Sequence, residues 1–100
     1  MSFIIKPGIY VVPDFGRIDC NNEVSDKNQV QLYLNPHFRV FIDATQKGIA
    51  LLKKEKLTEK QVAQLINRAK NPDEISWLLD VKSNKTLEKI ADIKINSFHK

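Results

Sequence analysis

Cysteine, glycine and long apolar runs are scarce in this 100-residue sequence. Its single cysteine, Cys20, excludes an internal disulfide and a cysteine-rich metal site. Its three glycines, at positions 8, 16 and 48, are too scattered for a phosphate-binding loop. No apolar run approaches the roughly 18 residues needed to span a bilayer, and residues 1–7 are too soon broken for a signal peptide. We therefore expect a cytoplasmic protein with no membrane partner.

Catalytic constellations are also missing from the sequence. His37 and His99 have no acid or nucleophile at a useful spacing, and Cys20 has no neighbouring histidine, so we expect an inert thiol. Asp14, Asp19 and Asp43 are expected in turns and helix caps. The sequence thus predicts a protein that is not an enzyme and that needs no cofactor or metal ion.

Charge is distributed unevenly along this small basic protein, whose formal net charge is +4. Basic and acidic residues balance in residues 1–50, so the whole excess lies in residues 51–100. The densest cluster is Lys53, Lys54, Lys56 and Lys60. Such a cluster is either a solvated helix surface or a patch that meets phosphates or an acidic peptide. Lysine outnumbers arginine, which disfavours sequence-specific DNA recognition.

The period of the apolar residues changes near residue 43, from strand-like to helical. Before that point, β-branched and aromatic runs at residues 3–5, 9–12 and 15–18 predict short strands, with prolines at their ends. Polar residues dominate residues 20–29, which predicts a mobile loop.

Residues 30–42 show the clearest alternation and predict a β-hairpin that turns at Pro36. Folding the segment there brings six apolar side chains to one face, Leu34 opposite Phe38, Leu32 opposite Val40 and Val30 opposite Ile42. A slip of one residue would separate the two apolar sets, so the register is strongly specified. We expect helices to cover this face.

Helix starts follow, each with its own capping residue. Two have the spacing of a capping box, Asp43 with Gln46 and Thr58 with Gln61. A third begins at Asn71, which precedes a proline and two acids, and a weaker fourth is predicted near Ser83.

Together these elements predict a small α+β domain of winged-helix-like character. N-terminal antiparallel strands and a hairpin are followed by three or four short helices. Residues 1–100 form a single domain in this prediction, with strands over about residues 3–42 and helices over about residues 44–95.

The segment from Gln31 through Val40 and Ile42 to Leu52, continued by residues 57–66, resembles a known family. This is the peptide-chaperone family of pyrroloquinoline quinone biosynthesis, whose members are recognition elements for ribosomally made, modified peptides. The likeness lies in the order of elements: a hairpin, a polar cap, a helix of small and aliphatic residues, a short turn and a second helix begun by Thr58. The chain departs from the family in the basic turn at residues 53–56.

The resemblance implies a non-catalytic module that captures a leader peptide for a modifying enzyme. The peptide would add a strand along residues 38–42, beside the third helix, and basic side chains would attract an acidic leader. The implied binding residues are Phe38, Arg39, Val40, Phe41, Ile75, Trp77, Leu78, Leu79 and Lys82. The alternative is that Phe41 and Trp77 simply pack in the core.

Two other functions are compatible with the sequence. Residues 59–69 and 72–82 have the spacing of a helix-turn-helix pair, although Asp73 and Glu74 at the start of the second helix would repel DNA. A structural or assembly subunit would instead form a homodimer through a sheet edge and Trp77. A peptide or protein partner is therefore expected first, and nucleic acid second.

Overall fold

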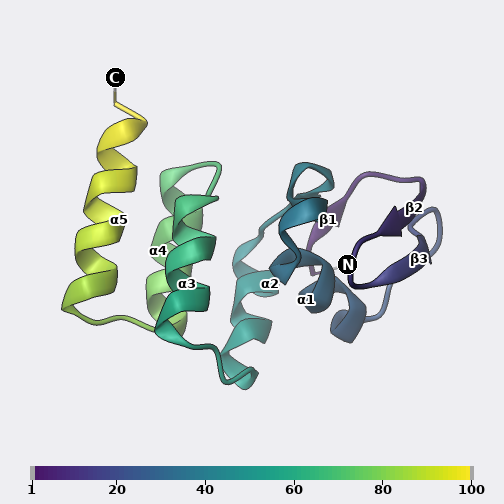
Figure 1. The fold of residues 1–100 in the computed structure, drawn as a ribbon, viewed down its shortest axis with the longest axis horizontal. Helices are drawn as coiled ribbons and strands as arrows, with labels where there is room; N and C mark the ends of the chain where they lie inside the picture. Colours follow the sequence, from purple (N-terminus) through teal and green to yellow (C-terminus); the bar gives the residue numbers. More distant parts are fainter. Residues whose placement is uncertain (1, 100) are drawn as a thin grey trace. The chain divides into compact units, whose positions relative to one another are not determined.

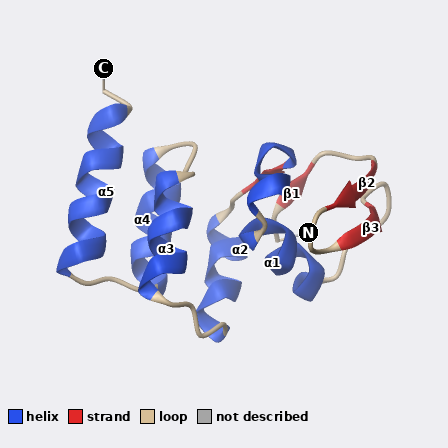
Figure 2. Cartoon of the chain, viewed as in Figure 1, coloured by secondary structure: helices blue, strands red, loops and turns tan. Residues whose placement is uncertain are grey.

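The computed structural model describes residues 2–99 and has an α+β fold, with short antiparallel strands near the N-terminus followed by helices (Figures 1 and 2). This confirms the predicted class, while the winged-helix-like arrangement and the single domain stay predictions. Two compact units divide the chain, Met1–Gly48 (unit 1) and Ile49–Lys100 (unit 2). Among residues 2–99, none of the helices combines the length and the apolar character that crossing a membrane requires.

Unit 1 contains four short strands in two antiparallel pairs. β1 (Ile4–Ile5) pairs with β4 (Ile42–Asp43), and β2 (Ile9–Val12) pairs with β3 (Gly16–Asp19). The predicted strands at residues 3–5, 9–12 and 15–18 are therefore confirmed to within a residue. In the first pair, Ile5 lies opposite Ile42 and both are buried. This pairing holds the N-terminal segment against β4.

A tight turn joins β2 to β3. Phe15 N donates to Val12 O at 3.1 Å, with Pro13 and Asp14 at the two central positions of the turn. Asp14 has φ +65° and Gly16 has φ +108°, both in the region that glycine, asparagine and aspartate tolerate best. Proline at the second position and positive φ at the third are typical of a type II turn.

The hairpin predicted for residues 30–42 is wrong, because this segment forms two helices. They are α1 (Asp26–Leu34) and the 3-10 helix η1 (Pro36–Phe41). The junction lies at Asn35, whose Oδ1 accepts a hydrogen bond from His37 N at 2.9 Å and so caps η1. The loop predicted for residues 20–29 is correspondingly shorter, since α1 begins at residue 26.

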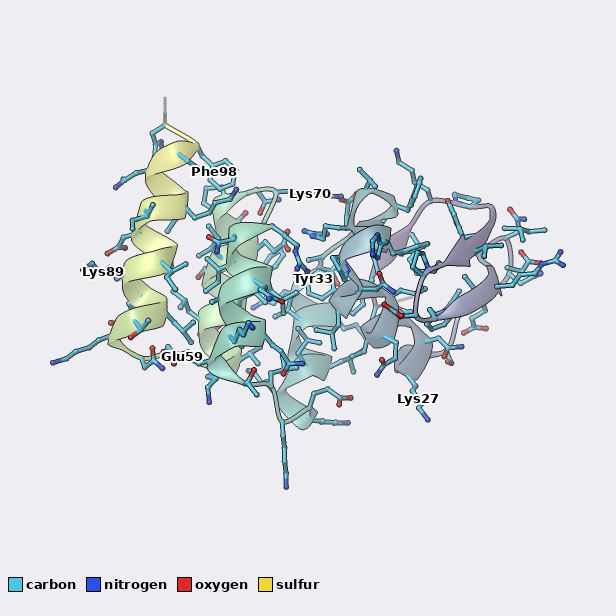
Figure 3. All side chains as sticks on the ribbon, viewed as in Figure 1. Lys27, Tyr33, Glu59, Lys70, Lys89 and Phe98 are labelled. Carbon is cyan, nitrogen blue, oxygen red and sulfur yellow. The ribbon has the colours of Figure 1, made fainter. Side chains whose placement is uncertain are left out.

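Two buried residues explain why the alternation was misleading. Gln29 and Tyr33 are both buried. In the predicted hairpin, Tyr33 lies between Leu32 and Leu34 and would point away from the apolar face, and Gln29 falls in the predicted loop. Val30 and Leu32 are buried as well. The four buried residues of this helix therefore show the three- and four-residue spacing of a helix face. Lys27, on the same helix, extends away from the unit (Figure 3).

Gln29 connects three parts of unit 1 through its buried amide. Its Oε1 accepts from Phe3 N at 2.9 Å, and its Nε2 donates to Val24 O at 2.6 Å. These bonds satisfy two backbone groups that the core would otherwise leave unpaired. Nearby, the Phe3 ring stacks on Tyr33 at 4.8 Å between centroids, so one side of α1 holds the N-terminal segment.

The first turn of α2 (Gln46–Leu51) also packs on the N-terminal segment. A Cβ added at Gly48 would lie 2.8 Å from Ser2 O and 2.9 Å from the Phe3 ring, so only glycine allows this approach. The cap predicted at Asp43 is wrong, because Asp43 lies in β4 and Gly48 N donates instead to Thr45 Oγ1 at 2.9 Å.

Unit 2 follows the predicted helix starts closely. After the 3-10 helix η2 (Leu52–Lys54) come α3 (Glu59–Asn67), α4 (Pro72–Val81) and α5 (Lys85–Ser97), and each of the last three packs against the other two. The core between them consists of Val62, Leu65, Ile66, Ile75, Leu78, Leu87 and Ala91, all buried.

The caps of these three helices are local. Thr58 forms the predicted capping box, with Gln61 N donating to Thr58 Oγ1 at 3.2 Å and Thr58 N to Gln61 Oε1 at 2.9 Å. Asn71 caps α4 as predicted. α5 begins close to Ser83, as predicted, and its cap is Asn84, since Leu87 N donates to Asn84 Oδ1 at 2.8 Å.

Candidate functional site

The predicted binding strand at residues 38–42 does not exist as a strand, and its side chains are divided between core and surface. Phe38 is buried in η1. Arg39 is buried too, with its Nη1 donating to Ile42 O at 2.7 Å and its guanidinium 5.1 Å from the Tyr33 ring centre. Val40 is exposed, and Phe41 is 36% exposed. Arg39 therefore stabilises unit 1 and does not present its charge to an acidic peptide.

The remaining predicted residues belong to unit 2, in or beside α4. Ile75 and Leu78 are fully buried in the core of that unit. Trp77 and Leu79 are half-buried, and Lys82 is exposed at the C-cap. These five residues and the four of η1 lie in different units, and three of the nine, Phe38, Ile75 and Leu78, are core residues with no surface to offer.

One face of β2 carries two exposed apolar side chains. Val11 is 82% exposed and Ile9 is 55% exposed. Residues at alternate positions share a face of a strand, so these two side chains lie together, next to Arg17 and Asp19 across the hairpin. We call these four residues the outer face of the hairpin.

The opposite face of β2 is anchored to the rest of unit 1. The Tyr10 ring packs edge-on against the Phe38 ring, with 5.0 Å between their centroids, and its centroid lies 4.8 Å from that of the Phe41 ring. Its hydroxyl donates to Lys6 O at 2.8 Å. At the turn, Asn35 Nδ2 donates to Pro13 O at 2.6 Å. The hairpin is therefore held in place from one side while its other side is bare.

The backbone hydrogen-bonding direction of the hairpin follows from its register. Cys20 N donates to Gly8 O at 2.7 Å, so positions 8 and 20 form a hydrogen-bonded pair. In an antiparallel ladder such pairs alternate with non-bonded ones, so Tyr10 and Val12 also bond inward to β3. The N–H and C=O groups of Ile9 and Val11 then point outward, away from β3. Among the described residues, no hydrogen bond reaches those groups.

Ile9 and Val11 thus combine bare apolar side chains with outward backbone groups on one open strand edge. Figure 1 draws β2 and β3 as a two-stranded ribbon, with no third strand paired to either. Such an edge is a template for an extended polypeptide segment, since backbone groups supply hydrogen bonds and side chains supply selectivity. The sequence predicted this strand but not its open edge.

A sequence signal for the missed site does exist. The run Ile9-Tyr10-Val11-Val12 is apolar on both of its faces. A strand in an isolated two-stranded ribbon buries only one face, so the second apolar face is surplus to the core.

Two open hollows of about 220 Å³ and 310 Å³ lie beside the β2–β3 turn and beside Leu57, respectively. Residues 2–99 contain no group of three His, Cys, Asp or Glu side chains placed to hold a metal ion. Cys20 is buried, and burial, with a smaller effect of Asp19, raises the pKa of its thiol above the ordinary value.

α4 offers little to a DNA groove. It contains no lysine or arginine between Pro72 and Val81. Asp73 and Asp80, two turns apart on one exposed side, would face phosphates there and repel them. Glu74, by contrast, is buried and accepts from Lys70 N at 3.2 Å, so its carboxylate belongs to the turn between α3 and α4. The basic side chains of unit 2 lie on other elements, such as Lys89 on α5 (Figure 3).

Comparison of the chain with protein-family models, with curated proteins and with solved structures found no match. The resemblance to the peptide-chaperone family therefore stays a prediction, and the candidate site rests on the geometry of the β2 edge.

Proposed function

We propose that this protein is a non-catalytic, cytoplasmic binding module that captures an extended segment of a peptide or protein partner on the β2 edge. The observation that carries the proposal is the coincidence, at Ile9 and Val11, of exposed apolar side chains and outward backbone groups. Neither feature alone is unusual, but together they supply both requirements of strand addition.

The partner's chemistry follows from the two faces of the edge. An added strand would exchange backbone hydrogen bonds with Ile9 and Val11, each contributing about 0.5–1.5 kcal/mol net. Its side chains on the outer face would lie beside those of Ile9 and Val11, and an apolar cross-strand pair contributes about 0.2–1 kcal/mol. The preferred segment is therefore extended, with apolar residues at every second position. These contributions suit weak, reversible capture.

This proposal keeps the predicted type of function and moves its site. Delivery of a leader peptide to a modifying enzyme remains one use of such a module. The strand that would receive the peptide is β2 rather than residues 38–42, because those residues form η1 and end in β4, which is already paired to β1.

A proline at position 11 tests the proposal directly. Val11 N–H points away from β3, so Val11→Pro removes a donor from the open edge without removing a ladder bond. The matched control is Val11→Thr, which keeps the N–H and the β-branched shape. Selection from a random peptide library with the wild-type protein should yield sequences that bind Val11→Thr and fail to bind Val11→Pro.

Amide chemical shifts make the outcome unambiguous. Titration of a selected peptide should perturb the amides of residues 8–12 most, and both variants should retain the dispersed spectrum of the folded hairpin. Equal binding to both variants, or a library that yields no sequence preferring the wild type over Val11→Pro, contradicts the proposal.

A further inference from the structure

The second edge of the hairpin, β3, has a different character from β2. Arg17 and Asp19 lie opposite Val11 and Ile9 in the non-bonded pairs of the hairpin. Their backbone N–H and C=O groups therefore point away from β2, just as those of Ile9 and Val11 point away from β3. Both side chains are exposed and lie on the outer face, with opposite charges two residues apart. This edge is therefore polar and charged, where the β2 edge is apolar.

Opposite charges on either side of one residue make the β3 edge complementary to itself. If two β3 strands pair antiparallel about a two-fold axis at Ile18, Arg17 of each copy lies opposite Asp19 of the other. All four outward N–H and all four outward C=O groups of those residues would come to lie in the bonded pairs of the new ladder. Two opposite-charge cross-strand pairs would form on the outer face at the same time.

We propose that two copies of this chain associate through their β3 edges, giving a four-stranded sheet in the order β2-β3-β3-β2. The charge pattern selects this pairing over others. A shift of the register by two residues would remove both Arg–Asp pairs, and a parallel arrangement in register would place Arg17 opposite Arg17 and Asp19 opposite Asp19. The closed two-fold symmetry also leaves both β2 edges free.

The position of the Asp19 carboxylate supports its role in such a pair. Its Oδ1 accepts from Asn21 N at 2.9 Å, and its Oδ2 accepts from Asn22 Nδ2 at 3.1 Å. These bonds hold the carboxylate at the end of β3, and each oxygen retains a second lone pair for an arginine. The pair would therefore form with one partner already ordered.

This inference goes beyond the proposed function, because it concerns the opposite edge and a different partner. Charge reversal provides its test. Arg17→Asp places like charges across the two-fold axis at both pairs, and Asp19→Arg does the same with the other sign. Mixed together, the two variants restore two attractive pairs, since each residue 17 then faces an opposite charge at residue 19.

Sedimentation equilibrium of the full chain up to about 1 mM should show a dimer for the wild type, weakening as salt rises. Arg17→Asp should lower the association constant about tenfold or more, because two favourable pairs become unfavourable. Native mass spectrometry of the mixture should show the heterodimer in excess of either homodimer.

Several outcomes would overturn this proposal. They are a wild type that stays monomeric, an Arg17→Asp variant that dimerises as well as the wild type, and a mixture without heterodimer enrichment. Because Asp19→Arg also removes the bond to Asn21 N, Asp19→Asn serves as a second variant that keeps this acceptor. It should dimerise less than the wild type and more than Arg17→Asp. Val11→Pro should dimerise as well as the wild type, because its substitution lies on β2. Loss of dimerisation through β3 and loss of peptide binding at β2 are therefore separate results.

Discussion

The two units of this chain are stabilised by hydrogen bonds of very different reach. In unit 2, the side-chain bonds that cap α3, α4 and α5 each join residues three positions apart. In unit 1, Gln29 bonds to a residue 26 positions away, Asn35 to one 22 away and Thr45 to one 43 away. Local caps occur in both units, and in unit 1 polar side chains also hold distant segments together.

This contrast determines what each unit can tolerate. A local cap stabilises one helix end, and its loss leaves groups that water can reach. A buried amide that joins three segments has no such substitute, because its loss leaves backbone groups unpaired inside the core. We therefore expect the largest mutational effects of polar residues in unit 1.

Gln29→Ala should give the largest effect. It removes the partners of Phe3 N and Val24 O, both in buried hydrogen bonds, at a cost of about 1–3 kcal/mol for each group. Denaturant unfolding followed by the signals of Tyr10 and Tyr33, the two tyrosines of the chain, should report this loss in unit 1.

The same helix provides the control. Gln31 is exposed, two residues further along α1, and Gln31→Ala should change the unfolding free energy by no more than about 0.5 kcal/mol. If the two variants are equally stable, the long-range role assigned to Gln29 is wrong and the contrast between the units loses its main support.

The same contrast explains which helices the sequence predicted. Thr58, Asn71 and the residues three positions after each are read directly from the chain, and both starts are confirmed. Gln29 could not be recognised in that way, because its partners lie far away in sequence and a glutamine counts as polar in any alternation. The helix α1 was therefore mistaken for a loop followed by a strand.

The candidate site is a strand edge, as the sequence predicted, but it lies on a different strand. A strand edge was expected to be the docking element, and the β2–β3 strands were correctly located. The sequence predicts that edge at residues 38–42, because the alternation of residues 30–42 indicates a hairpin where the structure has α1 and η1. Which strand edges stay open depends on tertiary pairing, and periodicity within one segment does not reveal it.

A smaller effect is expected for Asn71→Ala, which removes a hydrogen bond within unit 2. Asn71 Oδ1 accepts from Glu74 N at 2.9 Å, and loss of an asparagine cap costs about 1 kcal/mol. The only tryptophan, Trp77, lies in the helix that Asn71 caps, so indole fluorescence reports this change. Asn67→Ala, at the exposed end of α3, should leave stability nearly unchanged.

Comparing the unfolding transition of Trp77, in unit 2, with that of the two tyrosines, in unit 1, also tests the single domain predicted from the sequence. If Asn71→Ala shifts the Trp77 transition and leaves that of the tyrosines in place, the units unfold separately. If both transitions shift together, the units unfold as one cooperative domain.

The smallest effect should appear only in alkaline solution. Burial raises the pKa of the Cys20 thiol in the folded state, so the unfolded chain loses its proton first as the pH rises. The stability contributed by the protonated thiol is therefore complete below about pH 9 and falls as the pH approaches the higher folded-state pKa. Cys20→Ala lacks this titration, so its free energy of unfolding minus that of the wild type should rise steadily above that pH. All other groups are common to both proteins, so their contributions cancel in the difference. A difference that stays flat with pH would show that the thiol ionises equally well in both states.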